Sequence, residues 1–215
     1  MAVEVEARFS ADGPGPLTRL AAAASLGAAS LGPAITFDEI DRYLDTESGS
    51  LAAARWACRL RSRGSLVIIS LKGPPSGNSD GWLHRRPEVE GPASELLDAG
   101  TWPPSEARQR LLELSHGAAL HERFRLLQQR TERTVSIDGR QIGTLSLDEV
   151  RVERGGHQAA AFHVVELELS NDEFASREAL DDLAAALGET PGLAPEPHTK
   201  LEHALDALSP KTGLV

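Results

Sequence analysis

The sequence is poor in several residue types, and each shortage excludes a class of protein. It has a single cysteine, Cys58, in 215 residues, which excludes an internal disulfide framework and a zinc cluster built from thiolates. Basic residues are outnumbered, with 22 Lys and Arg against 32 Asp and Glu and a formal net charge of −10. Proteins that bind the nucleic-acid backbone usually carry a basic excess, so we expect no nucleic-acid partner.

Long hydrophobic runs and targeting signals are lacking as well. The longest stretch of low polarity, Leu20 to Ile35, is too short to span a bilayer. The N-terminus carries Glu4 and Glu6 where a secretory signal needs basic residues. An acidic chain is also repelled by an anionic membrane surface. These absences predict a cytoplasmic protein that does not act at a membrane.

What the sequence does contain is a series of alternating segments. In residues 3–9 the apolar side chains fall on one face and Glu4, Glu6 and Arg8 on the other, which is typical of a strand. Further strands are expected at 34–46, 52–61, 66–72, 82–90, 123–137, 141–153 and 160–170, with a hairpin turn at Asp138-Gly139. Helices are expected at 17–29, 92–99, 105–117, 173–187 and 199–208, the fourth capped by Asn171. The pattern predicts one α+β domain over residues 1–215, dominated by an antiparallel sheet.

Several of these strands concentrate full charges on one face. Arg59 and Arg61 share a face, as do Glu166 and Glu168. One such pair usually marks a solvated face, but like charges two residues apart repel and have no structural purpose. A closed barrel with a charged lumen would let these faces converge. Clustered carboxylates hold Mg²⁺ or Mn²⁺, clustered Arg and Lys hold phosphate, and the two together are the apparatus of phosphoryl transfer.

A family resemblance supports this interpretation. The segment Glu4-Val5-Glu6-Ala7-Arg8 resembles the Glu-x-Glu-x-Lys/Arg signature of the CYTH superfamily, the triphosphate tunnel metalloenzymes. In that family Lys is commoner than Arg at the position of Arg8. Further motifs follow in the family's order: Tyr43-Leu44-Asp45-Thr46, Cys58-Arg59-Leu60-Arg61, Ser70-Leu71-Lys72-Gly73-Pro74, Arg86-Pro87-Glu88-Val89-Glu90, Arg130 to Arg133, Leu147-Asp148-Glu149-Val150, Val165-Glu166-Leu167-Glu168 and Thr199-Lys200. The resemblance thus covers residues 4–200, nearly the whole chain.

The resemblance implies an eight-stranded antiparallel closed β-barrel, a tunnel with a charged lumen and helices packed outside. It implies that a divalent-metal-dependent hydrolase cleaves the terminal phosphate of a triphosphate, with Mg²⁺ or Mn²⁺ as cofactor and two ions per site. The metal ligands it implies are Glu4, Glu6, Asp148, Glu166 and Glu168, with Glu88 as a secondary candidate. The triphosphate would be bound by Arg8, Arg59, Arg61, Lys72, Arg133 and Lys200, with Arg86 and Arg130 as secondary candidates. Catalysis is expected from Glu4, Glu6, Lys72 and Arg133, the last preferred over Arg130.

The resemblance leaves the substrate open among inorganic tripolyphosphate, thiamine triphosphate, a nucleoside triphosphate and the adenylate cyclase reaction. An organic triphosphate needs an aromatic shelf, and aromatic residues make up only 4% of the chain, which favours inorganic tripolyphosphate. A non-catalytic polyphosphate-binding module is the alternative from another class, but it would have lost the metal-binding acids. The expected partner is a small triphosphate, and a homodimer, common in the family, is a candidate state.

Other residues invite a functional interpretation that we discount. The seven histidines show no metal-binding spacing and are expected to be structural or exposed. The acidic run from Asp38 to Asp45 is expected to be a solvated lead into a strand, with Tyr43 and Asp45 supporting the fold. Trp56 is three residues from Arg59 and is therefore expected on the opposite face, in the core.

Overall fold

The structure, a computed structural model, describes residues 2–75, 81–170 and 175–209. Eight antiparallel strands form a ring in the order β8, β4, β5, β6, β7, β1, β10 and β9, which closes because β9 also pairs with β8. Their bounds are β1 (Ala2–Ala11), β4 (Ile35–Thr46), β5 (Ala57–Arg63), β6 (Leu66–Lys72), β7 (Leu83–Pro92), β8 (Leu120–Ile137), β9 (Arg140–Arg154) and β10 (His157–Leu169). The predicted closed barrel is confirmed.

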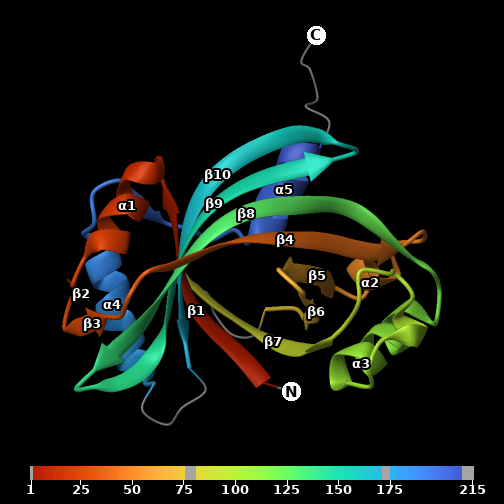
Figure 1. Cartoon of the computed structure of the whole chain (residues 1–215), viewed down its shortest axis with the longest axis horizontal. Coiled ribbons are helices and arrows are strands. Elements are labelled where there is room, and N and C mark those ends of the chain that lie inside the picture. The colour runs from red at the N-terminus through yellow and green to blue at the C-terminus, as the bar shows by residue number, and fades with distance from the viewer. Residues whose placement is uncertain (1, 76–80, 171–174, 210–215) are drawn as a thin grey trace.

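The remaining elements are short. Strands β2 (Ser25–Leu26) and β3 (Ala29–Leu31) extend the sheet beyond β8, and β11 (Leu193–Pro195) pairs with β1. The helices are α1 (Pro14–Ala22), α2 (Ser50–Ala53), α3 (Glu106–Ser115), α4 (Arg177–Gly188) and α5 (Lys200–Leu208), with a 3₁₀ turn at Ala99–Thr101. Figure 1 shows α1 and α4 gathered with β2 and β3 on one side of the barrel, and α2 and α3 on the other. None of the described helices is long and apolar enough to cross a membrane.

The hydrophobic cores lie mainly outside the barrel wall, because alternate side chains of each strand point outward. On one side, Phe9 of β1 and Leu167 of β10 pack in a core with Leu183 of α4. On the other side, Leu71 of β6 packs in a core with Leu111 of α3. These outer cores leave the opposite faces of the same strands pointing into the lumen.

Helix α5 is an exception to the expectation that the helices pack outside. Ala204 and Leu201 of α5 pack in a core with Tyr43, Phe124 and Val150, which share their faces with lumen residues of β4, β8 and β9. These strand residues form an apolar section of the lumen wall. Helix α5 therefore occupies one end of the tunnel and places its first residues beside the charged section.

Some predicted elements differ from the observed ones. Helix α1 ends at Ala22, and the rest of the predicted helix 17–29 forms β2 and β3. The segment from residue 52 begins in α2, because the Asp45 carboxylate accepts the backbone N–H groups of Leu51 and Ala52. No helix forms over the predicted 92–99. Helix α4 is capped by Ser176, and Asn171 lies outside the described residues.

Candidate active site

The lumen is lined by side chains that follow a period of two along the strands. A cavity of about 240 Å³ lies among them. Its charged lining comprises Glu4, Glu6, Arg8, Arg59, Arg61, Lys72, Arg86, Glu88, Glu90, Arg130, Glu132, Glu166, Glu168 and Lys200. Seven of these residues are acidic and seven are basic, so the lining has no net formal charge. All the predicted ligands except Arg133 and Asp148 are in this lining, and Asp148 lies directly behind it.

A first group of carboxylates comes from neighbouring strands β1 and β10. Glu6 lies opposite Glu168 in the antiparallel register, and Glu4 lies two residues before Glu6 on the same face. Burial and the charges of Glu4 and Glu6 raise the pKa of Glu168 to about 7. Burial also raises the pKa of Glu6, although Arg8 opposes it. Within the described ranges Glu168 has no ion-pair partner, so this group holds a carboxylate that the protein does not neutralise.

Glu4 is held by cations from β6 and β7. Its carboxylate is 2.5 Å from Lys72 Nζ and 3.0 Å from Arg86 Nε. Although burial opposes them, these two cations lower the pKa of Glu4 to about 2. Lys72 also lies 3.3 Å from Glu88, which accepts a hydrogen bond of 2.6 Å from Ser70. The secondary candidates Arg86 and Glu88 thus belong to the same cluster as Glu4.

A second pair of carboxylates, Asp148 and Glu166, is embedded among cations. Arg130 donates two bonds to Asp148, at 2.7 and 2.8 Å, and one of 3.0 Å to Glu166. Lys200 Nζ is 2.6 Å from Asp148 and 2.8 Å from Glu166. Arg8 adds a bond of 3.0 Å to Glu166. Despite complete burial, these cations hold the pKa values of both carboxyl groups below their usual range.

Arg59 and Arg61 occupy different environments although they share a face of β5. Arg61 makes a bidentate contact with Asp41, at 2.7 and 2.8 Å. Arg59 lies farther from its acids, at 3.6 Å from Asp41 and 3.8 Å from Glu90, and its buried Nε has no hydrogen-bond partner. A buried guanidinium with a free donor is costly unless a ligand satisfies it. Arg59 is thus a cation of the lumen with spare capacity for an anion.

The structure corrects the preference for Arg133 over Arg130. Arg133 lies outside the tunnel, where its guanidinium donates to the carbonyl groups of Leu20, Ala21, Ala23, Leu31 and Gly32. A cation is favourable there because it satisfies the free carbonyls at the end of α1. Arg133 therefore does not line the cavity, whereas Arg130 does.

A β-bulge decides which of the two arginines enters the lumen. In a regular hairpin about Asp138-Gly139, Arg133 would pair with Thr144, which lines the cavity. Ile142 is instead left without a partner on β8, so the register moves by one residue and Arg130 pairs with Asp148. A slip of one residue reverses the face of every following side chain.

The acidic run is the other correction. Glu39 and Asp41 are buried, with exposed fractions of 1% and 0%, and do not form a solvated lead into the strand. Glu39 pairs with Arg63, and Asp41 also accepts a bond of 2.7 Å from Gln128. Glu39, Asp41 and Tyr43 alternate along β4, and this period of two was the signal that could have placed them in the lumen. Asp45 does support the fold, and Trp56 packs beside the outer core as expected.

The donor set at the open end of the tunnel fits a divalent cation. Glu4, Glu6 and Glu168 offer carboxylate oxygens, the ligands that Mg²⁺ and Mn²⁺ prefer. They gather in one place although like charges repel, and the raised pKa of Glu168 records that repulsion. A bound cation would relieve it. Asp148 and Glu166 would become available to a metal only after Arg130 and Lys200 turn to another anion.

Comparisons with known proteins agree with this architecture. The model of the CYTH domain family matches residues 2–203. No curated protein matches the chain. Among solved structures, HpAC1 from Hippeastrum, a candidate adenylyl cyclase with a dominant triphosphatase activity, aligns with a TM-score of 0.66 at 17% identity over 94% of this chain and 95% of its own. A candidate adenylate cyclase from Bacillus halodurans aligns with a TM-score of 0.58 at 19% identity, over 94% of this chain and 98% of its own. At these identities the structural matches establish the fold.

Proposed function

The chain belongs to the CYTH domain family, and from this premise we propose that it hydrolyses a triphosphate, releasing the terminal phosphate with the help of a divalent cation. The observation that carries the proposal is the juxtaposition of the unpaired carboxylate of Glu168 with Arg59, whose buried Nε lacks a partner, in the lining of one cavity. Glu168 supplies a ligand for a cation, and Arg59 supplies a hydrogen-bond donor for a phosphate oxygen.

The charge of the lumen favours dependence on metal. Seven bases face seven acids in the lining, so the tunnel has no positive excess to offset a triphosphate. When bound by Glu4, Glu6 and Glu168, a divalent cation supplies that positive charge and makes water a stronger nucleophile. Mg²⁺ or Mn²⁺, with two ions per site, suits the number of carboxylates.

The cations of the chain bind and orient the substrate. Arg59 and Arg61 project from β5 toward the cavity and would bind phosphate oxygens through their planar N–H groups. Lys72 and Arg86 approach from the side of Glu4, and Arg130 and Lys200 from the side of Glu166. Cations on opposite sides would hold the triphosphate in line and stabilise the negative charge that grows on it as the terminal bond breaks.

The dimensions and composition of the cavity favour inorganic tripolyphosphate. Its volume of about 240 Å³ suits a compact anion, and Tyr43 is the aromatic side chain among its described lining residues. Tyr43 stacks on Phe124 through one face, with ring centroids 4.8 Å apart, and the residue is only 8% exposed, so little of its ring is free. An adenine or thiamine ring would lack a free aromatic surface against which to stack.

A panel of substrates tests the proposal. The purified chain is given tripolyphosphate, thiamine triphosphate, ATP or longer polyphosphate with Mg²⁺ or Mn²⁺, and orthophosphate and cyclic AMP are both measured. We expect orthophosphate from tripolyphosphate at the highest kcat/KM, and no turnover in excess chelator. Turnover that survives the chelator would contradict metal dependence, and binding of every substrate without turnover would indicate a polyphosphate-binding module.

Matched variants of adjacent residues on β9 test the site itself. Asp148 points toward the lumen, whereas Glu149 is exposed on the outer face. Asp148→Asn should lower kcat/KM by about 100-fold or more, since it removes a charge that fixes Arg130 and Lys200. Glu149→Gln should change kcat/KM less than about twofold. Equal activity in the two variants would sink the assignment of the lumen as the site.

A further inference from the structure

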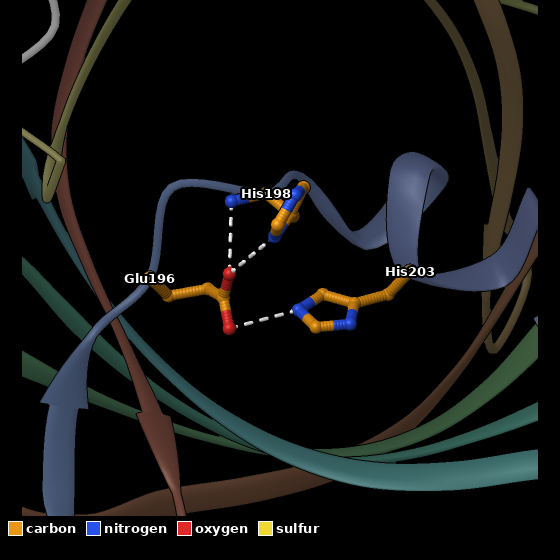
Figure 2. A group of neighbouring side chains, drawn as sticks. All are labelled: Glu196, His198 and His203. Carbon is orange, nitrogen blue, oxygen red and sulfur yellow. Dashed lines mark hydrogen bonds and ion pairs between the residues drawn. The ribbon is translucent and has the colours of Figure 1, made fainter. Parts of the chain in front are cut away.

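A cluster of potential metal ligands lies on the segment that joins β11 to α5 and on the first turn of α5, apart from the carboxylates of the lumen. Glu196, His198 and His203 converge there, and Figure 2 shows both imidazole rings directed at the one carboxylate. Glu196 Oε1 lies 3.2 Å from His198 Nδ1, and Glu196 Oε2 lies 2.9 Å from His203 Nε2. The histidines were expected to be structural or exposed, and the spacing of these two in the sequence matches no familiar metal motif.

The geometry of the cluster suits a small transition-metal ion. One ligand atom from each of the three residues lies within 4.8 Å of the others. Tetrahedral zinc sites have metal–ligand bonds of about 2.0–2.2 Å, which places neighbouring nitrogen and oxygen ligands about 3.3 Å apart. The two separations around Glu196 are close to that value but involve different carboxylate oxygens, so a rotation of the carboxylate and small shifts of the rings would bring one oxygen and two ring nitrogens around one ion.

The surroundings hold the ligands in place. Glu196 is 6% exposed, its backbone N–H donates to Arg8 O at 3.0 Å, and its carbonyl lies 2.9 Å from His84 Nε2. Burial and the charge of Arg8 lower the pKa of His84 to about 4, so His84 is neutral and donates to that carbonyl. His203 stacks on Phe162, with ring centroids 5.0 Å apart. Ligands fixed in this way lose little freedom when an ion binds.

One side of the cluster is open to solvent. The side chain of His198 is 55% exposed and that of His203 is 33% exposed, whereas the carboxylate of Glu196 lies buried beneath them. An ion can therefore reach the cluster from solvent, and a water molecule can complete a coordination of four. The donor set of two imidazoles and one carboxylate differs from the all-carboxylate set at the tunnel mouth, and imidazole favours zinc over magnesium.

We propose that Glu196, His198 and His203 form a binding site for Zn²⁺ or a similar transition-metal ion, separate from the divalent cation of the tunnel. The ion would tie the segment after β11 to α5. Lys200 lies between His198 and His203 in the chain and contacts Asp148 and Glu166, so the ion would also fix the approach of Lys200 to the lumen.

Zinc binding by the untagged full chain tests this proposal. The protein is stripped with a chelator and titrated with Zn²⁺ against a chromophoric chelator, with Mg²⁺ in large excess to occupy the carboxylates of the lumen. We expect the wild type to bind one Zn²⁺ per chain. The dissociation constant should be at least about 10-fold larger in His198→Ala and in His203→Ala. His121→Ala is the matched control, because His121 faces the single carboxylate of Glu47 at 3.7 Å without a second imidazole, and should bind as the wild type does.

Cobalt spectra provide a readout that needs no variant. Co²⁺ bound in a tetrahedral site of nitrogen and oxygen ligands absorbs visible light far more strongly than Co²⁺ in water, and Zn²⁺ should displace it stoichiometrically. Absence of Zn²⁺ binding in excess Mg²⁺, a Co²⁺ spectrum like that of the free ion, or equal Zn²⁺ affinity in wild type and His198→Ala would each overturn the proposal. None of these readouts depends on triphosphate turnover, so the failure of one proposal is distinguishable from the failure of the other.

Discussion

At the scale of single residues, Arg130 and Arg133 show how position on a strand determines the role of identical side chains. Arg130 contacts two lumen carboxylates, whereas Arg133 satisfies five backbone carbonyls outside the barrel. Both residues are buried, at 7% and 6% exposure, so burial alone does not separate them. Only the partners do so, and they predict different consequences of the same substitution.

Arg130→Lys and Arg133→Lys form a matched pair of variants. Lysine keeps the charge but cannot make the bidentate contact with Asp148, so Arg130→Lys should lower kcat/KM by about 10- to 100-fold. Arg133→Lys should leave kcat/KM within about twofold but lower the melting temperature, because an ammonium group cannot satisfy five carbonyls. Steady-state kinetics with tripolyphosphate and thermal unfolding measure both effects. The reverse pattern, with Arg133→Lys inactive and stable, would contradict the assignment.

Glu168 makes the stability of the metal-free protein depend on pH. Its pKa is about 7 in the folded state against 4.5 ordinarily, so between those values the folded state binds more protons than the unfolded state. Its contribution to stability is therefore present below pH 4.5 and is lost as the pH rises toward and past 7. At pH 8 we therefore expect Glu168→Gln to be more stable than wild type and to unfold at a higher temperature. The gain in the free energy of unfolding should be about 1 kcal/mol or less, because the side chain of Glu168 remains partly exposed to solvent.

Thermal unfolding between pH 5 and pH 8, with a chelator present, measures this difference. The gap between Glu168→Gln and wild type should close toward pH 5 and should also close at pH 8 when Mg²⁺ is added, since the cation relieves the same repulsion. A gap that is constant with pH would show that the carboxylate charge is not its cause.

At the scale of elements, the bulge at the start of β9 determines which face of β8 lines the lumen. Gly143 follows Ile142, which has no partner on β8, and a Cβ atom at Gly143 would lie 2.4 Å from the carbonyl oxygen of Glu168. Two strands can approach this closely only because the residue lacks a side chain. The glycine thus sets the position of the backbone that carries Glu168.

Gly143→Ala should destabilise the protein by about 1–3 kcal/mol and lower kcat/KM, because β9 and β10 must separate where Glu168 is held. Gly13→Ala is the control, since an added Cβ at Gly13 meets nothing within 4 Å and its φ of 168° is extended. Chemical denaturation and tripolyphosphate kinetics compare the two variants. A Gly143→Ala protein as stable and active as Gly13→Ala would show that the contact is relieved without cost.

The residues that could be placed from the sequence are those governed by local alternation. Glu4, Glu6 and Arg8 share a face because side chains along a strand alternate, and the same rule places Arg59 with Arg61 and predicts their convergence in the lumen. The rule fails across the bulge at Ile142, because nothing in residues 130–133 reveals a register set by the neighbouring strand. It also cannot reveal that α5 enters one end of the tunnel or that His198 and His203 meet, because both depend on contacts between distant parts of the chain.

At the scale of the whole molecule, the lumen holds its cations and carboxylates against each other. Arg130 and Lys200 pair with Asp148 and Glu166, and Lys72 pairs with Glu4. Under the proposed function, a bound triphosphate would draw these cations toward itself and leave carboxylates that only added cations could neutralise. The binding of substrate and the binding of metal are therefore expected to favour each other, and thermodynamic linkage requires the effect to be reciprocal.

Calorimetric titration with an imido-bridged tripolyphosphate, which resists hydrolysis, measures this linkage. We expect Mg²⁺ to tighten analogue binding by about 10-fold or more, and the analogue to tighten Mg²⁺ binding by the same factor. Glu168→Gln should reduce the factor because it removes a ligand for the cation. Independent binding of analogue and Mg²⁺ would contradict the linkage.

The position of α5 also limits how molecules can enter and leave the tunnel. Since the helix occupies one end of the tunnel, substrate and product would, under the proposed function, share the other end, on the side of Glu168. A long polyphosphate could insert only its tip and would be shortened from that end, because the chain cannot be threaded past α5 for an internal cut. Under the proposed function, orthophosphate would leave by that same end before the next substrate enters, so we expect orthophosphate to inhibit in competition with substrate.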